Sequence, residues 1–138
     1  MAYNPAGVVS YGFPIDVTIF TYLFSGLADD AAVAAAAGKA VSQDITAANT
    51  VKLAGDGEVI FGRVFLAENR SGGGVGIKTG AIQRLFKEKL PAATGHGIVV
   101  GDRVIGAGGG LVKKDTTATR ANPLVIETGT DYVVVEKL

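Results

Sequence analysis

The sequence predicts a mainly β protein: a small β-barrel-like or sandwich-like domain with one short helix and an extended N-terminal arm. Twenty of the 138 residues are glycine, and the chain has neither cysteine nor tryptophan. In the last hundred residues, the glycines separate short runs that are rich in Val, Ile and Phe. These turn signals recur about every ten residues, which is typical of a sandwich or a barrel. Without cysteine, the domain must fold without disulfide bonds.

The predicted arm, residues 1–26, differs from the rest of the chain. It holds six of the ten aromatic residues, and Pro5 and Pro14 interrupt it. Residues 16–24 favour β structure, so we expect one strand within the arm. An aromatic-rich extended segment can add a strand to a neighbouring subunit; the alternative is an ordinary first strand that closes the chain's own barrel. Because aromatic side chains dominate interface energetics, the predicted contact residues are Tyr11, Phe13, Phe20, Tyr22 and Phe24.

A single short helix is predicted over residues 29–37, where alanine dominates. Asp29 can cap the free amides at its start, and Asp30 suits the positive end of the helix dipole. Gly38 can adopt the left-handed conformation that ends a helix. The alternative is a loop of small residues.

The remaining chain completes a β-barrel-like domain over residues 27–138. Gly62 suits a bulge or a bend in a long strand. The final strand is nearly all β-branched, which predicts a central, paired position. We expect strands near 39–43, 50–54, 58–68, 75–80, 82–89, 98–106, 110–114, 123–127 and 131–137.

Composition limits the classes of partner. Thirteen basic residues balance thirteen acidic ones, which argues against nucleic-acid binding. Residues 1–38 carry only acidic charges, so they can complement a partner or a neighbouring copy. Hydrophobic residues make up 48% and charged residues 19% of the chain, as expected for buried subunit contacts. The longest apolar stretch, 17–28, is too short to span a bilayer, so no membrane partner is predicted.

The motifs that suggest chemistry all have simpler readings. Residues 72–79 resemble a phosphate-binding loop, but Ile77 stands where that loop needs glycine before Lys78. His96, the only histidine, lies between two glycines in a predicted loop, without the partners of a triad or a metal site. The carboxylate pairs Asp29/Asp30 and Asp56/Glu58 fit a helix start and a turn. The sequence therefore predicts no enzyme, no cofactor and no metal.

Four stretches give the second part of the chain a family likeness, which covers roughly residues 36–138. It resembles small bacteriophage capsid decoration proteins, also called head-stabilising or cement proteins. In that family a Gly-Lys-Ala-Val strand opens the barrel, and a Val-Gly-Asp-Arg-Val turn precedes a glycine hairpin that leads into Val-Lys. The matching stretches are 37–44, 55–64, 100–113 and 130–138.

The resemblance implies a non-enzymatic structural protein of the virion. Such proteins add to the outer surface of the phage head after assembly in the host cytoplasm, often as homotrimers. There they bind the major capsid protein and stabilise contacts between its subunits. Two alternatives remain open at this point: another structural virion component, such as a tail, spike or head–tail joining module, or a non-catalytic β module that binds carbohydrate or another ligand.

Overall fold

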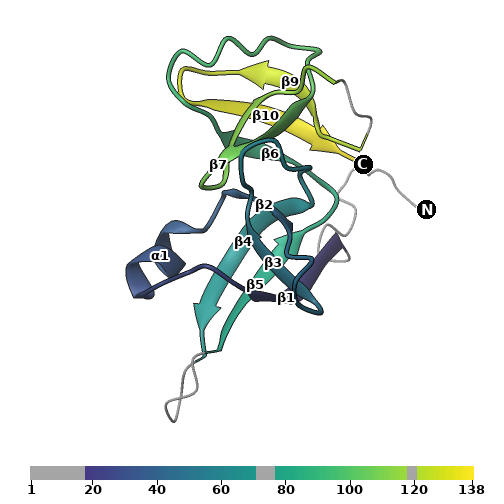
Figure 1. The fold of residues 1–138 in the computed structure, drawn as a ribbon. Coiled ribbons are helices and arrows are strands. Elements are labelled where there is room, and N and C mark those ends of the chain that lie inside the picture. Colours follow the sequence, from purple (N-terminus) through teal and green to yellow (C-terminus); the bar gives the residue numbers. More distant parts are fainter. Residues whose placement is uncertain (1–17, 71–76, 118–120) are drawn as a thin grey trace, which may run out of the picture.

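The computed structural model describes residues 18–70, 77–117 and 121–138, and within them the chain is mainly β, as the sequence predicts (Figure 1). The elements are β1 (Ile19–Phe24), α1 (Asp30–Ala35), β2 (Ala40–Gln43), β3 (Thr50–Leu53), β4 (Gly62–Asn69), β5 (Lys78–Gln83), β6 (Phe86–Pro91), β7 (Val104–Gly108), β8 (Leu111–Lys114), β9 (Leu124–Thr128) and β10 (Tyr132–Lys137). They form two units, one above the other in Figure 1.

The first unit is a closed barrel with the strand order β1-β3-β2-β4-β5. It closes because β1 pairs antiparallel with β5 and parallel with β3. Alternate residues of the strands point inward and fill the barrel with apolar side chains. Helix α1 adds Val33 to the same core, and its C-cap residue Ala36 adds a second side chain. The buried members are Phe24, Leu27, Val33, Ala36, Val41, Val51, Val64 and Ile82.

The strand expected within the arm is part of this barrel. Residues 19–23 of β1 pair with β5, and Leu23 and Phe24 pair with β3. For residues 19–24 the structure therefore matches the alternative, a first strand that closes the chain's own barrel. The predicted boundary at residue 26 does not separate arm from domain, because β1 is held in the barrel by β3 and by β5, whose paired residues are more than fifty positions away. Residues 1–17 lie outside the described part of the chain.

Helix α1 begins where the sequence predicts. The Asp29 side chain accepts a hydrogen bond from the Ala32 amide at 2.8 Å, the geometry of an N-cap. Gly38 has a φ of 83°, the left-handed conformation expected after a helix. The helix is six residues long, shorter than the predicted 29–37, because the chain leaves it early to pair the Gly38 amide with the Val64 carbonyl.

The second unit consists of strands β6 to β10. It contains a three-stranded sheet in the order β6-β10-β9 and the two-stranded hairpin β7-β8. Two isolated bridges, Ala92 with Val112 and Arg103 with Leu124, join the hairpin to both edges of the sheet. The five strands therefore form a ring that is only partly hydrogen-bonded. Strand β10 lies in the centre of its sheet, as predicted for the final strand.

Glycines bring the two units into direct contact. Gly106 exchanges two backbone hydrogen bonds with the segment between β3 and β4, at 2.8 Å and 2.9 Å. Gly110 bridges the barrel strands β2 and β3 by accepting from the Ala40 amide and donating to the Ala54 carbonyl. Ala40, Ala54 and also Ile60 are buried in the same apolar cluster as the core of the second unit. The barrel wall thus forms one side of the second core.

Three strand boundaries differ from the prediction. The strand expected over 58–68 begins at Gly62, because residues 55–60 contact the second unit. The break expected at residue 81 lies instead at 84–85, because β1 and β4 pair with both sides of β5. The strand expected over 98–106 begins only at Val104, after a turn in which the Val99 amide bonds the Asp102 carboxylate.

Candidate interaction surface

The outer wall of the closed barrel exposes apolar side chains over three adjacent strands. Strand β5 lies between β1 and β4, and its residue Ala81 pairs with Thr21 on one side and Leu66 on the other. The adjacent cross-strand pair, Val64 and Ile82, is buried inside the barrel. Since successive side chains of a strand point to opposite faces, Ala81 and its partners face outward.

Four large side chains form this exposed wall, which we call the outer face. They are Leu23 of β1, Phe65 and Leu66 of β4, and Ile77 immediately before β5, with exposed fractions of 42 to 56%. The register of β4 against β5 shifts between Val64 and Leu66, and a bulge of this kind re-aims the extra side chain. Phe65 therefore lies outside the barrel beside Leu66. Gly62, where the sequence suggested a bulge, instead lets the Gln83 backbone approach closely.

The sequence carried a signal for this surface that we did not use. Val64, Phe65 and Leu66 are three consecutive apolar residues in one strand. Because successive side chains of a strand point to opposite faces, such a run must expose at least one of them.

The predicted contact residues have different positions. Tyr11 and Phe13 lie outside the described residues. Phe20 is half exposed, at 52%. Tyr22 is partly buried against the barrel core. Phe24 is only 5% exposed, because β1 points it into the barrel; a ring that fills the core is not available to another protein, so Phe24 is removed from the contact residues.

Tyr22 belongs to a small cluster at one end of the barrel. Its ring meets that of Phe61 edge-on, with centroids 5.4 Å apart, a favourable geometry for aromatic pairs. The Arg84 guanidinium lies 3.6 Å from the Phe61 ring centroid and donates to the Phe61 carbonyl and the Tyr22 hydroxyl. Arg84 precedes β6 in the chain and folds back onto the barrel.

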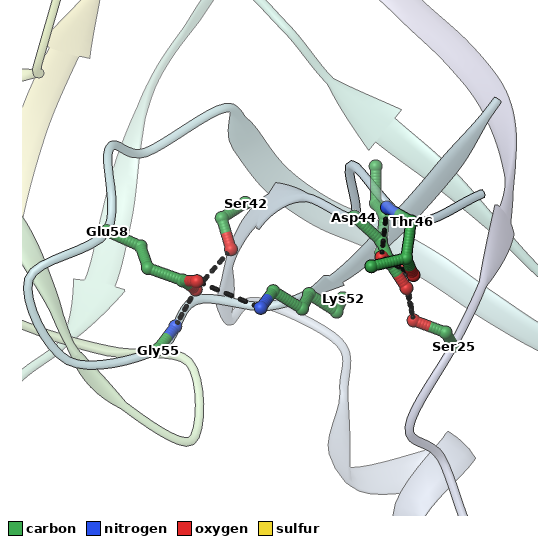
Figure 2. A network of polar contacts seen from close by, with 8 residues as sticks. Ser25, Ser42, Asp44, Thr46, Lys52, Gly55 and Glu58 are labelled. Carbon is green, nitrogen blue, oxygen red and sulfur yellow. Dashed lines mark hydrogen bonds and ion pairs between the residues drawn. The ribbon is translucent and has the colours of Figure 1, made fainter. Parts of the chain in front are cut away.

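Glu58 is the centre of a polar network that ties three parts of the barrel together (Figure 2). Its carboxylate accepts hydrogen bonds from the Ser42 hydroxyl at 2.7 Å and the Gly55 amide at 2.6 Å. Lys52 forms an ion pair with it at 2.9 Å. The hydrogen bonds from Lys52 and Ser42 lower the pKa of Glu58, and Glu58 in turn raises the pKa of Lys52.

Asp44 forms a second, similar network beside the turn after β2 (Figure 2). It accepts hydrogen bonds from the Ser25 hydroxyl at 2.7 Å and from the amide and hydroxyl of Thr46. These bonds, that from Ser25 first, lower the pKa of Asp44 to about 2. Both carboxylates are held ionised by donors of their own fold, which suits a structural role and not proton transfer.

The other candidates for chemistry are also structural. His96 lies in a loop, as predicted; its Nδ1 accepts from the Ile98 amide at 2.9 Å, and its Nε2 lies 2.8 Å from the Gly129 carbonyl oxygen. Lys78 and Thr79 lie in β5, where a phosphate-binding loop would have a helix. Residues 71–76, which hold the glycines of that string, lie outside the described residues.

The described residues contain few features that suggest a ligand. They include no group of three or more acidic or histidine residues placed to hold a metal ion. None of their helices is long and apolar enough to cross a membrane. Two hollows stand out, of about 280 Å³ and 260 Å³. The smaller is lined by Ser42, Gln43, Glu58, Val59 and Phe61, next to the aromatic cluster.

Comparison with known proteins gives no match. No protein-family model matches the chain, and neither the curated proteins nor the solved structures include a match to it.

Proposed function

We propose that this chain is a structural virion protein, a decoration or cement protein that binds the outer surface of a phage head. In this role it contacts the major capsid protein, self-associates as a homotrimer and stabilises contacts between capsid subunits, without catalysing a reaction. The observation that carries the proposal is the outer face, Leu23, Phe65, Leu66 and Ile77, on the wall of a closed barrel. The resemblance of residues 36–138 to decoration proteins gives the partner.

The outer face fits a protein partner better than a small ligand. Its side chains lie on a convex wall of paired strands, whereas small-molecule sites are concave. Its apolar side chains lie on one face of the three adjacent strands β1, β5 and β4, and an exposed face rich in large apolar side chains marks an interaction site. Phe20 is also half exposed, but it pairs with Ile82 of the inward-facing residues, so it is not part of the outer face.

Burial of such a face gives enough free energy for attachment. At about 25 cal/mol per Å², covering a few hundred Å² contributes several kcal/mol before the costs of association. Attachment of a trimer at three points multiplies the effect through effective concentration. A closed barrel also has no free strand edges and little internal freedom, so its surface loses little conformational entropy on binding.

Co-sedimentation of the full chain with empty heads of the virus that encodes it tests the proposal. We expect the wild-type chain to pellet with the heads, and the variant F65S/L66S to lose at least nine-tenths of its bound fraction. The matched control is V99S/V100S, since Val99 and Val100 are adjacent, equally exposed apolar residues of the second unit. The control variant is expected to bind like the wild type.

Two results would contradict the proposal. A wild-type chain that stays in the supernatant at all ratios would exclude binding to heads. Equal losses in the two variants would exclude the outer face as the contact surface. Cryo-electron microscopy of the decorated particle then distinguishes the head surface from the tail, spike or head–tail joint by the position of the added density.

A further inference from the structure

A second surface of the molecule has unpaired positive charge. Lys137 is the last residue of β10 and pairs in register with Phe86 at the start of β6. Its side chain is half-buried, yet within the described ranges no carboxylate lies within ion-pair distance of it. Burial penalises an isolated charge, so a carboxylate partner would stabilise the Lys137 ammonium group.

Arg84 adds to this positive charge. It lies two residues before Phe86, the register partner of Lys137. Within the described residues its guanidinium donates hydrogen bonds to two neutral groups, the Phe61 carbonyl and the Tyr22 hydroxyl. Burial lowers the pKa of Lys137, and the positive charge of Arg84 lowers it further. Two cations are thus held close together by the fold, without an acid between them in the described residues.

A hollow of about 280 Å³ lies directly beside Lys137. Its other lining residues are Arg103, Ala121, Asn122, Leu124, Glu136 and Leu138. Asn122 is buried and already bonded, through its side chain, to the Ile60 amide and to Asp115. Arg103 donates to the Asn122 carbonyl at 2.7 Å. No ion pair joins Glu136 to Lys137 among the described residues.

We propose that this hollow receives a carboxylate side chain of a partner protein, with Lys137 as its ion-pair partner and Arg84 reinforcing the positive field. A protein is favoured as the source because Leu85, adjacent to Arg84, and Phe20, whose strand pairs with the strand just before Arg84, are each about half exposed. Leu85 thereby offers a partner an apolar contact next to Arg84. The even balance of charges over the whole chain does not suit nucleic acid. This site is separate from the outer face, so it does not depend on the proposed function.

Nuclear magnetic resonance on the full chain with isotope-labelled lysine tests the inference. The probe is the blocked peptide acetyl-Gly-Glu-Phe-Gly-amide, and its glutamine analogue is the control peptide. We expect the glutamate peptide to shift the Lys137 signal saturably, with a Kd of about 1 mM, and to raise the pKa of the ammonium group. The glutamine peptide is expected to do neither.

Variants locate the binding site. K137Q is expected to weaken binding of the glutamate peptide at least ten-fold, whereas K137R is expected to retain it. Binding to both variants is monitored through the backbone amide signals of Leu124 and Glu136. The matched control is K87Q, since Lys87 is an exposed lysine on β6 that pairs with Glu136. Absence of a saturable shift at about twenty times the expected Kd, an equal response to the glutamine peptide, or equal losses in K87Q and K137Q would each overturn the inference.

Discussion

The two units of the molecule use strands of similar length in different ways. The first closes completely, with every strand of the barrel paired on both sides, and it carries its polar networks and its exposed apolar wall outside a core of its own. The second is a sheet and a hairpin joined by two isolated bridges, and its core includes Ala40, Ala54 and Ile60 of the first. The first unit therefore has a complete core of its own and serves as the frame of the molecule, whereas the second depends on the first for part of its core.

The largest expected effect tests this dependence by deleting core volume in each unit. Leu90 and Ile82 are fully buried in the second and first core, respectively. L90A and I82A should each lower the free energy of unfolding by about 2–5 kcal/mol. Because the barrel wall belongs to both cores, we expect both units of each variant to unfold in one shared transition. Urea titration monitored through amide signals from both units measures it. An L90A protein whose barrel signals unfold at the wild-type midpoint would show that the units are independent.

The next effect concerns the glycine contact between the units. A Cβ at Gly106 would collide with the Gly55 carbonyl oxygen, a backbone atom that cannot move aside, and would lie 3.1 Å from the Glu58 oxygen. We expect G106A to destabilise the protein by about 1–3 kcal/mol, or more if the hairpin detaches.

The matched control for this contact is G80A within the barrel. A Cβ at Gly80 would meet the Phe24 ring at 2.7 Å, a side chain that can adjust. Chemical denaturation should therefore give a smaller loss for G80A than for G106A. The reverse order would mean that backbone contact between the units is not what holds them together.

A smaller, pH-dependent effect tests the polar networks of the frame. The pKa of Asp44 is about 2 in the folded protein and 3.8 ordinarily. Because the folded pKa is the lower one, the folded state binds fewer protons, and its stability rises with pH between these values. The contribution is fully present above about pH 4 and is lost as the pH falls towards 2.

The variant D44N lacks this titration. Urea midpoints measured from pH 7 to pH 2 should therefore fall less steeply below pH 4 in D44N than in the wild type, while D29N, which keeps a side-chain oxygen at the helix cap, serves as the control. Parallel curves for D44N and the wild type would show that the Asp44 network does not stabilise the fold.

The smallest expected effect on stability belongs to the outer face. Phe65 and Leu66 are about half exposed, so F65S/L66S should change the free energy of unfolding by less than about 1 kcal/mol, since exposed positions are usually within about 0.5 kcal/mol each. Thermal denaturation checks this. A large loss of stability would mean that these residues serve the barrel and not a partner, and would weaken the proposed function.

How much the sequence determined can be judged from particular elements. Asp29 and Gly38 mark the ends of a helix through local chemistry, and both act as predicted. The β-branched final strand was predicted to be central, and it is. The helix ends depend on neighbours within a few residues, and the β-branched composition of the final strand is visible in the sequence itself, so the sequence alone reveals these features.

Only the tertiary structure decided which strands pair. The sequence assigned 16–24 to an arm, whereas β1 pairs with residues around 50 and 80. A break was expected at residue 81, but Gly80 and Ala81 both lie inside β5, with Gly80 packed against the Phe24 ring. Strand pairing also produces three other features that the sequence did not predict. They are the division into two units, the exposed wall at the Phe65 bulge and the proximity of Lys137 to Arg84. A period of two in a sequence reports the faces of a strand but not its partners, because pairing is fixed by contacts between residues far apart in the chain.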